Sequence, residues 1–367
     1  MRETSQVSRK DKMAHLFIPG PTDVHPDVLA AQAQTMIGHR GQDFEALFAR
    51  LQTKLRQLFY TNHRIYVSTS SGTGLQEAAI RNCVARRVLC CVNGAFSERW
   101  YEVALANGKS ATPLYVKWGR AITSDLVDAA LSADDYDAIT LVHNETSTGV
   151  ASPIQDIAAL VRAHYPRVTI LVDAVSSLGG VKLDFDRWGL DVLLTSSQKC
   201  LALPPGLSFA AVSDRALEKA RGVPNRGLYF DFVDLEAHLL KNQTPATPAI
   251  TLMWALDAGL DRILAEGLDA RFERHACMAA RAQAWAAERF DLFAQHGYRS
   301  ATVTCVKNTR RMDVTALNSY LRARHMQISD GYGRLKGDTF RIAHMGEIGL
   351  TDLDAVLATM DEFIASS

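Results

Sequence analysis

Two residues that could do chemistry, Asp173 and Lys199, each follow an apolar segment of the kind that forms a buried strand. Asp173 ends the run 168–172, and Lys199 comes shortly after the run 192–194. A lysine can form a Schiff base with an aldehyde, and a carboxylate can keep a pyridine nitrogen protonated so that the ring accepts electrons. A lysine and an aspartate at neighbouring strand ends are therefore what pyridoxal phosphate (PLP) chemistry requires.

Three further segments fall at expected strand ends. Residues 68–74 contain two glycines and precede an expected helix, whose N-terminal N–H groups could bind an anion. A phosphate site and a plain polar helix cap both remain open there, because the Walker and dinucleotide-binding patterns are absent. Phe96 could lie against a flat ring or simply pack in the core. A hydroxyl within 143–149 could reach a phenolic oxygen, or the segment could be a turn and cap.

The pattern from about residue 60 to 215 alternates short apolar runs with helical segments. The runs show no alternation of apolar and polar residues, which is typical of strands buried on both faces; they are 65–67, 88–92, 138–142, 168–172, 192–194 and 207–212. This pattern predicts an α/β fold with a mostly parallel central sheet and helices on both faces. Ligands bind beyond the carboxyl ends of the strands in such sheets, where the polar residues above fall.

The remaining chain predicts a smaller α+β domain. Helical patterns cover 249–266 and continue to about 290, and strands at 302–306 and 339–343 alternate with helices at 314–324 and 352–364. We place the boundary near residue 255, which divides the chain into a large PLP-binding domain with an N-terminal arm (14–255) and a small C-terminal domain (256–367). Residues 1–13 are expected to form a loose tail, and Met13 is a candidate start beside Met1.

Composition limits the partners that the chain can bind. Lys plus Arg and Asp plus Glu each number 40, which argues against an extended nucleic-acid or anionic-membrane surface. No apolar run is long enough to span a bilayer. The six cysteines form no disulfide or metal-ligand pattern, so we expect free thiols in the cytoplasm and no metal.

Several short motifs then carry a resemblance that spans residues 14 to 365. They include Pro-Gly-Pro-Thr at 19–22, Ser-Gly-Thr-Gly at 71–74, Asn-Gly-Ala-Phe at 93–96, Glu-Thr-Ser-Thr-Gly at 145–149, Ser-Gln-Lys at 197–199, Thr-Pro at 247–248 and Phe-Arg-Ile-Ala-His-Met-Gly at 340–346. Their order resembles that of fold-type I PLP enzymes. Within these, the chain is most similar to the class V aminotransferases of the alanine/serine–glyoxylate (serine–pyruvate) group.

The resemblance implies a role for each site residue. Lys199 would carry the internal aldimine and then shuttle the proton, Asp173 would pair with the pyridine nitrogen, and Arg341 would clamp the substrate α-carboxylate with its planar fork. The residues implied to contact the cofactor are Ser71, Gly72, Thr73 and Gln198 at the phosphate, Phe96 on the ring, Thr146 at the phenolic oxygen, and Thr247 at the phosphate of the neighbouring subunit. The resemblance thus implies a homodimer with shared active sites.

The resemblance further implies ping-pong transamination between alanine or serine and glyoxylate or pyruvate. Two departures weaken the transfer of substrate preference: Phe96 stands where tryptophan is frequent, and Thr244 where tyrosine is frequent. The roles of His39, Arg40, Arg226 and Tyr229 stay open between a side-chain pocket and surface or interface contacts.

Three other functions remain as alternatives. One is a 2-aminoethylphosphonate–pyruvate aminotransferase, in which Arg341 would serve the 2-oxo acid. Another is a cysteine desulfurase-like lyase; members of that group stack a histidine on the ring and use a loop cysteine, whereas Phe96 holds this position here. The third is a binding protein that has lost catalysis, against which the joint presence of Lys199, Asp173 and Arg341 argues.

Overall fold

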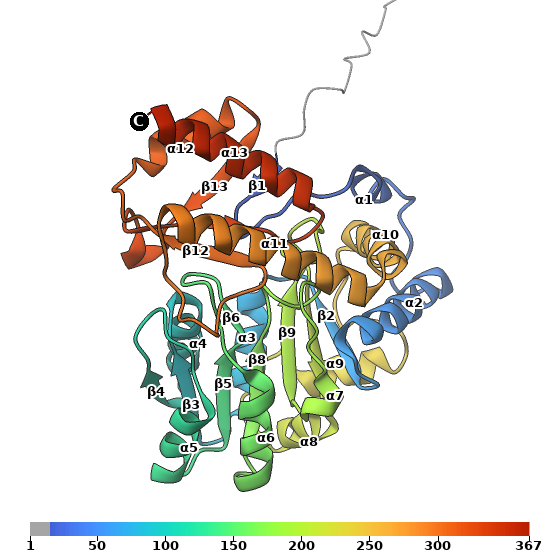
Figure 1. Cartoon of the computed structure of the whole chain (residues 1–367). Helices are drawn as coiled ribbons and strands as arrows, with labels where there is room; N and C mark the ends of the chain where they lie inside the picture. The colour runs from blue at the N-terminus through green and yellow to red at the C-terminus, as the bar shows by residue number, and fades with distance from the viewer. Residues whose placement is uncertain (1–14, 367) are drawn as a thin grey trace, which may run out of the picture.

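The computed structural model describes residues 15–366, so the expected tail at 1–13 lies outside the described residues. A seven-stranded sheet forms the centre of the larger part of the molecule (Figure 1). Its strands, in spatial order, are β2 (Arg64–Ser68), β10 (Ser208–Val212), β9 (Val192–Ser196), β8 (Thr169–Asp173), β5 (Ala138–Val142), β3 (Arg87–Val92) and β4 (Ser110–Tyr115). β10 runs antiparallel to both of its neighbours, β2 and β9, and the other neighbouring pairs are parallel. The predicted α/β fold with a mostly parallel sheet is confirmed.

Helices cover both faces of this sheet, which explains why its central strands are apolar throughout. One layer contains α3 (Gly72–Cys83), α4 (Ala95–Ala106) and α8 (Asp214–Gly222), and the other contains α5 (Ser124–Ala133), α6 (Ile154–His164) and α7 (Phe185–Trp188) (Figure 1). Near β2 pack α2 (Gln42–Phe59) and α9 (Phe232–Leu239), while α1 (Pro26–Ala31) and α2 contact α10 (Ile250–Glu266).

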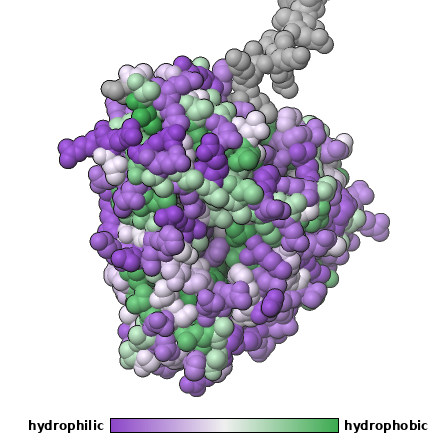
Figure 2. Space-filling model, viewed as in Figure 1, coloured by the Kyte–Doolittle hydropathy of each residue, from purple (hydrophilic) through white to green (hydrophobic). Residues whose placement is uncertain are grey.

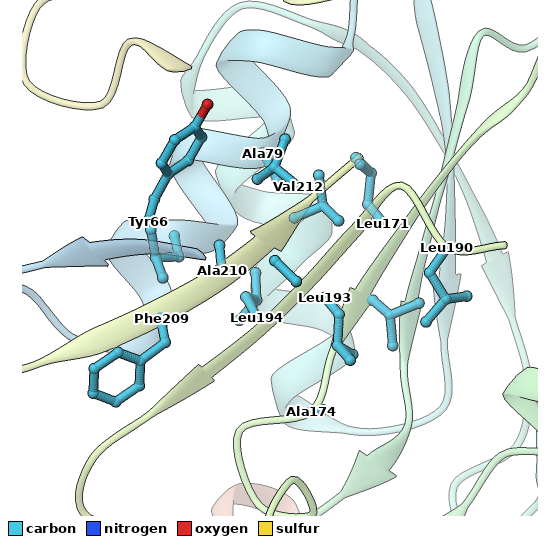
Figure 3. Close-up of a cluster of buried hydrophobic side chains, with 14 of the residues drawn as sticks. Tyr66, Ala79, Leu171, Ala174, Leu190, Leu193, Leu194, Phe209, Ala210 and Val212 are labelled. Carbon is cyan, nitrogen blue, oxygen red and sulfur yellow. The ribbon is translucent and has the colours of Figure 1, made fainter. Parts of the chain in front are cut away.

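A tightly packed core holds the strand ends in place. Figure 3 shows Tyr66, Ala210 and Leu194, which come from three adjacent strands in register, beside Ala79 of α3. The Tyr66 hydroxyl donates a hydrogen bond to the backbone carbonyl of Phe232, so its one polar atom is satisfied within the core. Interiors packed in this way have low compressibility, and the loops that leave this sheet therefore start from fixed positions.

A second sheet lies above the first in Figure 1. It contains β1 (His15–Phe17), β13 (Met326–Asp330), β14 (Thr339–Ala343), β12 (Val303–Lys307) and β11 (Asp291–Leu292), with α11 (Leu268–Arg289), α12 (Val314–Arg322) and α13 (Leu350–Ser366) packed on it. The N-terminal β1 pairs with β13 in parallel, a contact that the sequence analysis did not predict. The division of the chain near residue 255 stays a prediction.

The surface, the helices and the candidate metal ligands within residues 15–366 bear on which partners the chain can bind. On the face seen in Figure 2, hydrophilic and hydrophobic residues are interspersed. Within residues 15–366, none of the helices combines the length and apolar character needed to cross a bilayer. The same residues contain no group of three or more His, Cys, Asp or Glu side chains that could hold a metal ion.

Candidate active site

A pocket of about 270 Å³ opens at the carboxyl ends of β5, β8 and β9. This edge of the central sheet faces the smaller sheet in Figure 1. The pocket is lined by eight of the residues that the sequence analysis singled out, namely Ser71, Gly72, Thr73, Phe96, Thr146, Asp173, Gln198 and Lys199. Segments more than 100 residues apart in the chain are thus brought to one cavity by the parallel topology.

Lys199 lies in the turn after β9, covered by the N-terminal segment. Its Nζ donates a hydrogen bond to the carbonyl of Pro19, and Thr22 Oγ1 donates to the Lys199 carbonyl at 3.0 Å. Gly20 has a φ of 102°, and a Cβ there would lie 2.5 Å from Lys199 Nζ, so this close approach requires glycine. Burial, reinforced by the positive charge of Arg341, lowers the pKa of Lys199 to about 8. A substantial fraction of the amine is therefore neutral near physiological pH.

Asp173 ends β8, the strand next to β9. Its Oδ1 accepts a hydrogen bond from the Val175 N–H at 2.7 Å, and its Oδ2 accepts one from Gln76 Nε2 at 2.6 Å. Burial raises the pKa of Asp173 to about 6, so the carboxyl is still ionised at pH 7.5. A buried carboxylate held in this way is disposed to pair with a cationic ring nitrogen. The sequence analysis missed Gln76, although this residue follows Gly72 by one helical turn and shares its face of α3.

The first turn of α3 offers an anion site. Ser71 is its N-cap residue, but no side chain caps the turn. The free N–H groups and the helix dipole are therefore available to a phosphate. Ser196 Oγ is buried, has no hydrogen-bond partner and lines the same pocket. A Cβ on Gly72 would lie 2.5 Å from Val175 Cγ2, which explains the glycine.

Phe96 and Arg99 project from α4, whose N-terminus is held by Glu145. Gly94, the N-cap residue, has no side chain with which to cap the helix. Instead, the fully buried Glu145 carboxylate accepts hydrogen bonds from the Phe96 and Ser97 N–H groups at 3.2 and 2.9 Å. The hydroxyls of Ser97 and Ser147 donate to it as well, at 2.9 and 2.6 Å. Glu145 thus fixes the helix turn that presents Phe96 to the pocket.

Thr146 belongs to a buried network beside the pocket. Its Oγ1 lies 2.7 Å from Ser176 Oγ, which also accepts a hydrogen bond from Asn144 Nδ2 at 2.8 Å. Asn144 Oδ1 is buried without a partner. Hydroxyl and amide groups therefore line the wall where a polar ring substituent could be recognised.

Arg341 lies on β14, next to the pocket wall but not in the lining of the pocket. It is 7% exposed, and it donates to the Asp330 carbonyl from Nε at 3.1 Å and to the Thr146 carbonyl from Nη1 at 3.4 Å. Within residues 15–366 its guanidinium has no carboxylate partner. Its positive charge nevertheless reaches the pocket, because it helps to lower the pKa of Lys199.

Thr247 does not line the Lys199 pocket of its own chain. It borders a second pocket of about 200 Å³ together with Thr69, Leu228 and Tyr229. Of the residues whose roles were open, Arg226 forms an ion pair with Asp231, and Arg40 donates to the carbonyls of Thr244 and Pro245. Neither arginine lines the Lys199 pocket.

The residues of the Lys199 pocket fit the chemistry of PLP. They supply an amine of lowered pKa, a buried carboxylate, an uncapped helix N-terminus and an aromatic face. The unpartnered Ser196 hydroxyl and Asn144 carbonyl oxygen are further polar groups that a polar cofactor would satisfy.

Comparison with known proteins agrees with this interpretation. The family model for aminotransferase class-V matches residues 23–334. An uncharacterised aminotransferase of Methanocaldococcus jannaschii is 37% identical, over 94% of this chain and 91% of that protein. L-aspartate–glyoxylate aminotransferase of Paracoccus denitrificans is 34% identical, over 95% of this chain and 91% of that protein. The crystal structure of alanine–glyoxylate aminotransferase from Nostoc sp. superposes with a TM-score of 0.90 at 29% identity, covering 96% of both chains.

Proposed function

We propose that this chain, which belongs to the class V aminotransferases, moves the amino group of a small L-amino acid to glyoxylate with PLP in the Lys199 pocket. The observation that carries the proposal is the pair of buried groups at adjacent strand ends, the Lys199 amine and the Asp173 carboxylate. The names of the Paracoccus denitrificans relative and of the Nostoc sp. structure supply glyoxylate as the acceptor. Alanine, serine and aspartate are the donors to be tested.

When bound, PLP supplies an aldehyde for the Lys199 amine and a protonated ring that accepts electrons. The pKa of about 8 leaves the amine partly neutral, so Lys199 can attack as a nucleophile and later take the proton from the substrate Cα. Asp173 retains the proton on the ring nitrogen, while Gln76 and the Val175 N–H hold its carboxylate in place. Arg341 has no carboxylate partner among residues 15–366 and is free to bind that of either substrate.

A homodimer with shared sites is part of this proposal. Thr247 lies in the second pocket, where Leu228 and Tyr229 are 85% and 54% exposed. Large exposed apolar side chains around a pocket favour contact with another chain. We propose that this face meets a second copy, so that Thr247 reaches the partner's phosphate site. The free cysteines suit the reducing cytoplasm, which is the proposed location.

A desulfurase reaction is not favoured, because it needs an accessible thiolate. Cys305 lies opposite Arg341 on the neighbouring strand, but it is buried, and burial raises its pKa to about 12. Cys200, beside Lys199, is likewise buried, with a pKa raised to about 12. Both side chains are neutral thiols at physiological pH. Phosphonate transamination is not favoured either, since the Paracoccus denitrificans relative and the Nostoc sp. structure are named for an amino acid and glyoxylate.

The test is a matrix of donors and acceptors with purified holoenzyme. Alanine, serine and aspartate are each combined with glyoxylate, and serine and aspartate also with pyruvate, and glycine or alanine formation is measured against the 2-oxo acid released. We expect equimolar products with glyoxylate and at least one donor, and none with Lys199→Ala. Sulfide from cysteine, or turnover of 2-aminoethylphosphonate alone, would instead support one of the other reactions. Protein that stays colourless after reconstitution with PLP would refute the cofactor assignment.

A further inference from the structure

Two guanidinium groups contact one tyrosine beside the Lys199 pocket. Tyr332 lies in the loop between β13 and β14, and its hydroxyl accepts a hydrogen bond from Arg99 Nη2 at 3.2 Å. Arg341 Cζ lies 5.4 Å from the centroid of the Tyr332 ring. Arg99 lines the pocket, whereas Arg341 lies behind its wall. The sequence analysis gave no role to Arg99 or Tyr332.

Aromatic contacts hold Arg99 in position. Its Cζ lies 5.2 Å from the centroid of the Phe96 ring, and the Phe96 and Tyr332 rings are 5.1 Å apart. Phe96 and Arg99 share one face of α4, whose first turn is fixed by Glu145. Such packing limits the freedom of a long side chain, so a ligand that binds Arg99 immobilises little further conformational freedom.

Neither guanidinium forms an ion pair with an acidic side chain within residues 15–366. The two carboxylates whose charges act on Arg341, Glu145 and Asp330, are already engaged. Glu145 accepts the hydrogen bonds at the start of α4, and Asp330 Oδ1 accepts the N–H groups of Gly331 and Gly337 at 2.7 and 3.0 Å. Two fixed cations without ion-pair partners, one lining the pocket and one behind its wall, favour a ligand that brings two negative groups.

We propose that Arg99 is a specificity residue and that the amino donor is a dicarboxylic amino acid, aspartate or glutamate. This inference rests on the proposed function. Arg341 takes the α-carboxylate, and Arg99, which donates to the Tyr332 hydroxyl, takes the side-chain carboxylate. Alanine and serine leave the second guanidinium without a partner. A site built to bind a polar group discriminates against an analogue that lacks the group.

The first experiment compares donors with the wild-type holoenzyme and glyoxylate. The donors are L-aspartate, L-glutamate, L-alanine, L-serine and O-phospho-L-serine, and the readout is kcat/KM. We expect the better of the two dicarboxylic donors to exceed alanine by at least about tenfold, the value of one charge-assisted hydrogen bond. Equal or higher values for alanine and serine would refute the inference while leaving the proposed function intact. Phosphoserine as the best donor would show that the second anion is a phosphate and would overturn the carboxylate assignment.

The second experiment changes the residues. Arg99→Gln should lower the ratio of kcat/KM for the dicarboxylic donor over alanine by about 10- to 100-fold. Arg99→Lys keeps the positive charge but loses the planar guanidinium, so its ratio should lie between those of the wild type and Arg99→Gln. Arg334→Gln is the matched control, because Arg334 stacks on Trp118 at 3.7 Å in the Tyr332 loop and does not line the pocket. A ratio that Arg99→Gln leaves unchanged, or that Arg334→Gln lowers equally, contradicts the assignment.

Ligand binding separates this inference from the catalytic one. Succinate carries two carboxylates and butyrate one, and neither has an amino group. Calorimetry with the wild-type holoenzyme should give a Kd for succinate at least about tenfold lower than for butyrate, and Arg99→Gln should remove the difference. If no amino acid is turned over but succinate binds as expected, the proposed function fails, while the assignment of Arg99 and Arg341 as a site for two carboxylates stands. Equal binding of the two acids by the wild type refutes the site, even if Arg99→Gln does not fold.

Discussion

Replacing Asp173 by asparagine should stabilise the PLP-free protein at neutral and alkaline pH. Burial raises the pKa of Asp173 from 3.8 to about 6. Folding thus favours the protonated carboxyl, and its ionisation lowers the free energy of unfolding as the pH rises from about 4 to about 6. A difference of about two pKa units corresponds to about 3 kcal/mol, which persists above pH 7. An uncharged asparagine side chain at this position avoids this cost.

The site can accept the new amide without losing a hydrogen bond. The amide oxygen can still accept the Val175 N–H, which now binds Asp173 Oδ1 at 2.7 Å. Gln76 Oε1 is buried without a partner, so after a flip of the Gln76 amide it can accept the new N–H group. Gln76 Nε2 then takes the unpartnered position of Oε1, so the number of unsatisfied polar groups does not rise and the electrostatic gain remains.

Urea denaturation of wild-type and Asp173→Asn apoprotein provides the assay. The variant should be more stable by about 3 kcal/mol at about pH 8, and the difference should shrink to under about 1 kcal/mol at about pH 4. Asp338→Asn, the same change at an exposed carboxylate, is the control and should show no such pH dependence.

With PLP bound, the wild type should be more stable than Asp173→Asn, because the wild-type carboxylate then pairs with the ring nitrogen. Turnover of the variant should fall by about 100- to 1,000-fold. Equal apoprotein stabilities at pH 8, or a difference that persists at pH 4, would refute this reasoning.

Three further predictions concern the other charged groups of the pocket. Lys199→Ala should abolish transamination and the absorbance of the lysine-linked cofactor, and appreciable turnover would remove the assignment of Lys199 as the base. Arg341→Ala should raise KM for both substrates by about 10- to 100-fold, because both carry a carboxylate; an unchanged KM would mean that another residue binds it. The rate of PLP uptake by the apoprotein should rise as the pH passes through about 8, because burial lowers the pKa of Lys199 to about 8 and the neutral amine is the nucleophile. A flat profile in stopped-flow absorbance would contradict attack by the neutral amine.

The sequence predicted the buried strands well, because burial on both faces leaves an uninterrupted apolar run. The runs at 138–142 and 339–343 coincide with β5 and β14, and 207–212 differs from β10 by one residue. The edge strand β4 was missed, since Ser110–Tyr115 is half-exposed and contains Pro113. Edge strands tolerate proline and polar residues, so they lack the pattern on which the prediction depended.

The residues lining the pocket could be anticipated for a topological reason. Parallel strands present their carboxyl ends at one edge, and a polar residue after each apolar run is therefore a candidate for the same cavity. Supporting contacts do not follow from this rule. Gln76 acts on Asp173 across 97 positions of the chain, and Glu145 acts on α4 from 48 positions away. Both supporting side chains lie within or beside the expected motifs, but their partners depend on how α3 and α4 pack on the sheet.

Arg271 shows the limit of sequence reasoning most clearly. It lies on α11, is fully buried, and donates hydrogen bonds to the carbonyls of Gly179, Cys200 and Gly346 at 2.9, 2.6 and 3.3 Å. Glu266 balances its charge at 2.6 Å, without which such burial would be costly. Backbone carbonyls are common to every residue type, so the sequence gives no sign of these acceptors. Because Cys200 follows Lys199 and Gly346 follows the strand that carries Arg341, this one side chain helps to set the separation of the amine and the guanidinium on which the chemistry depends.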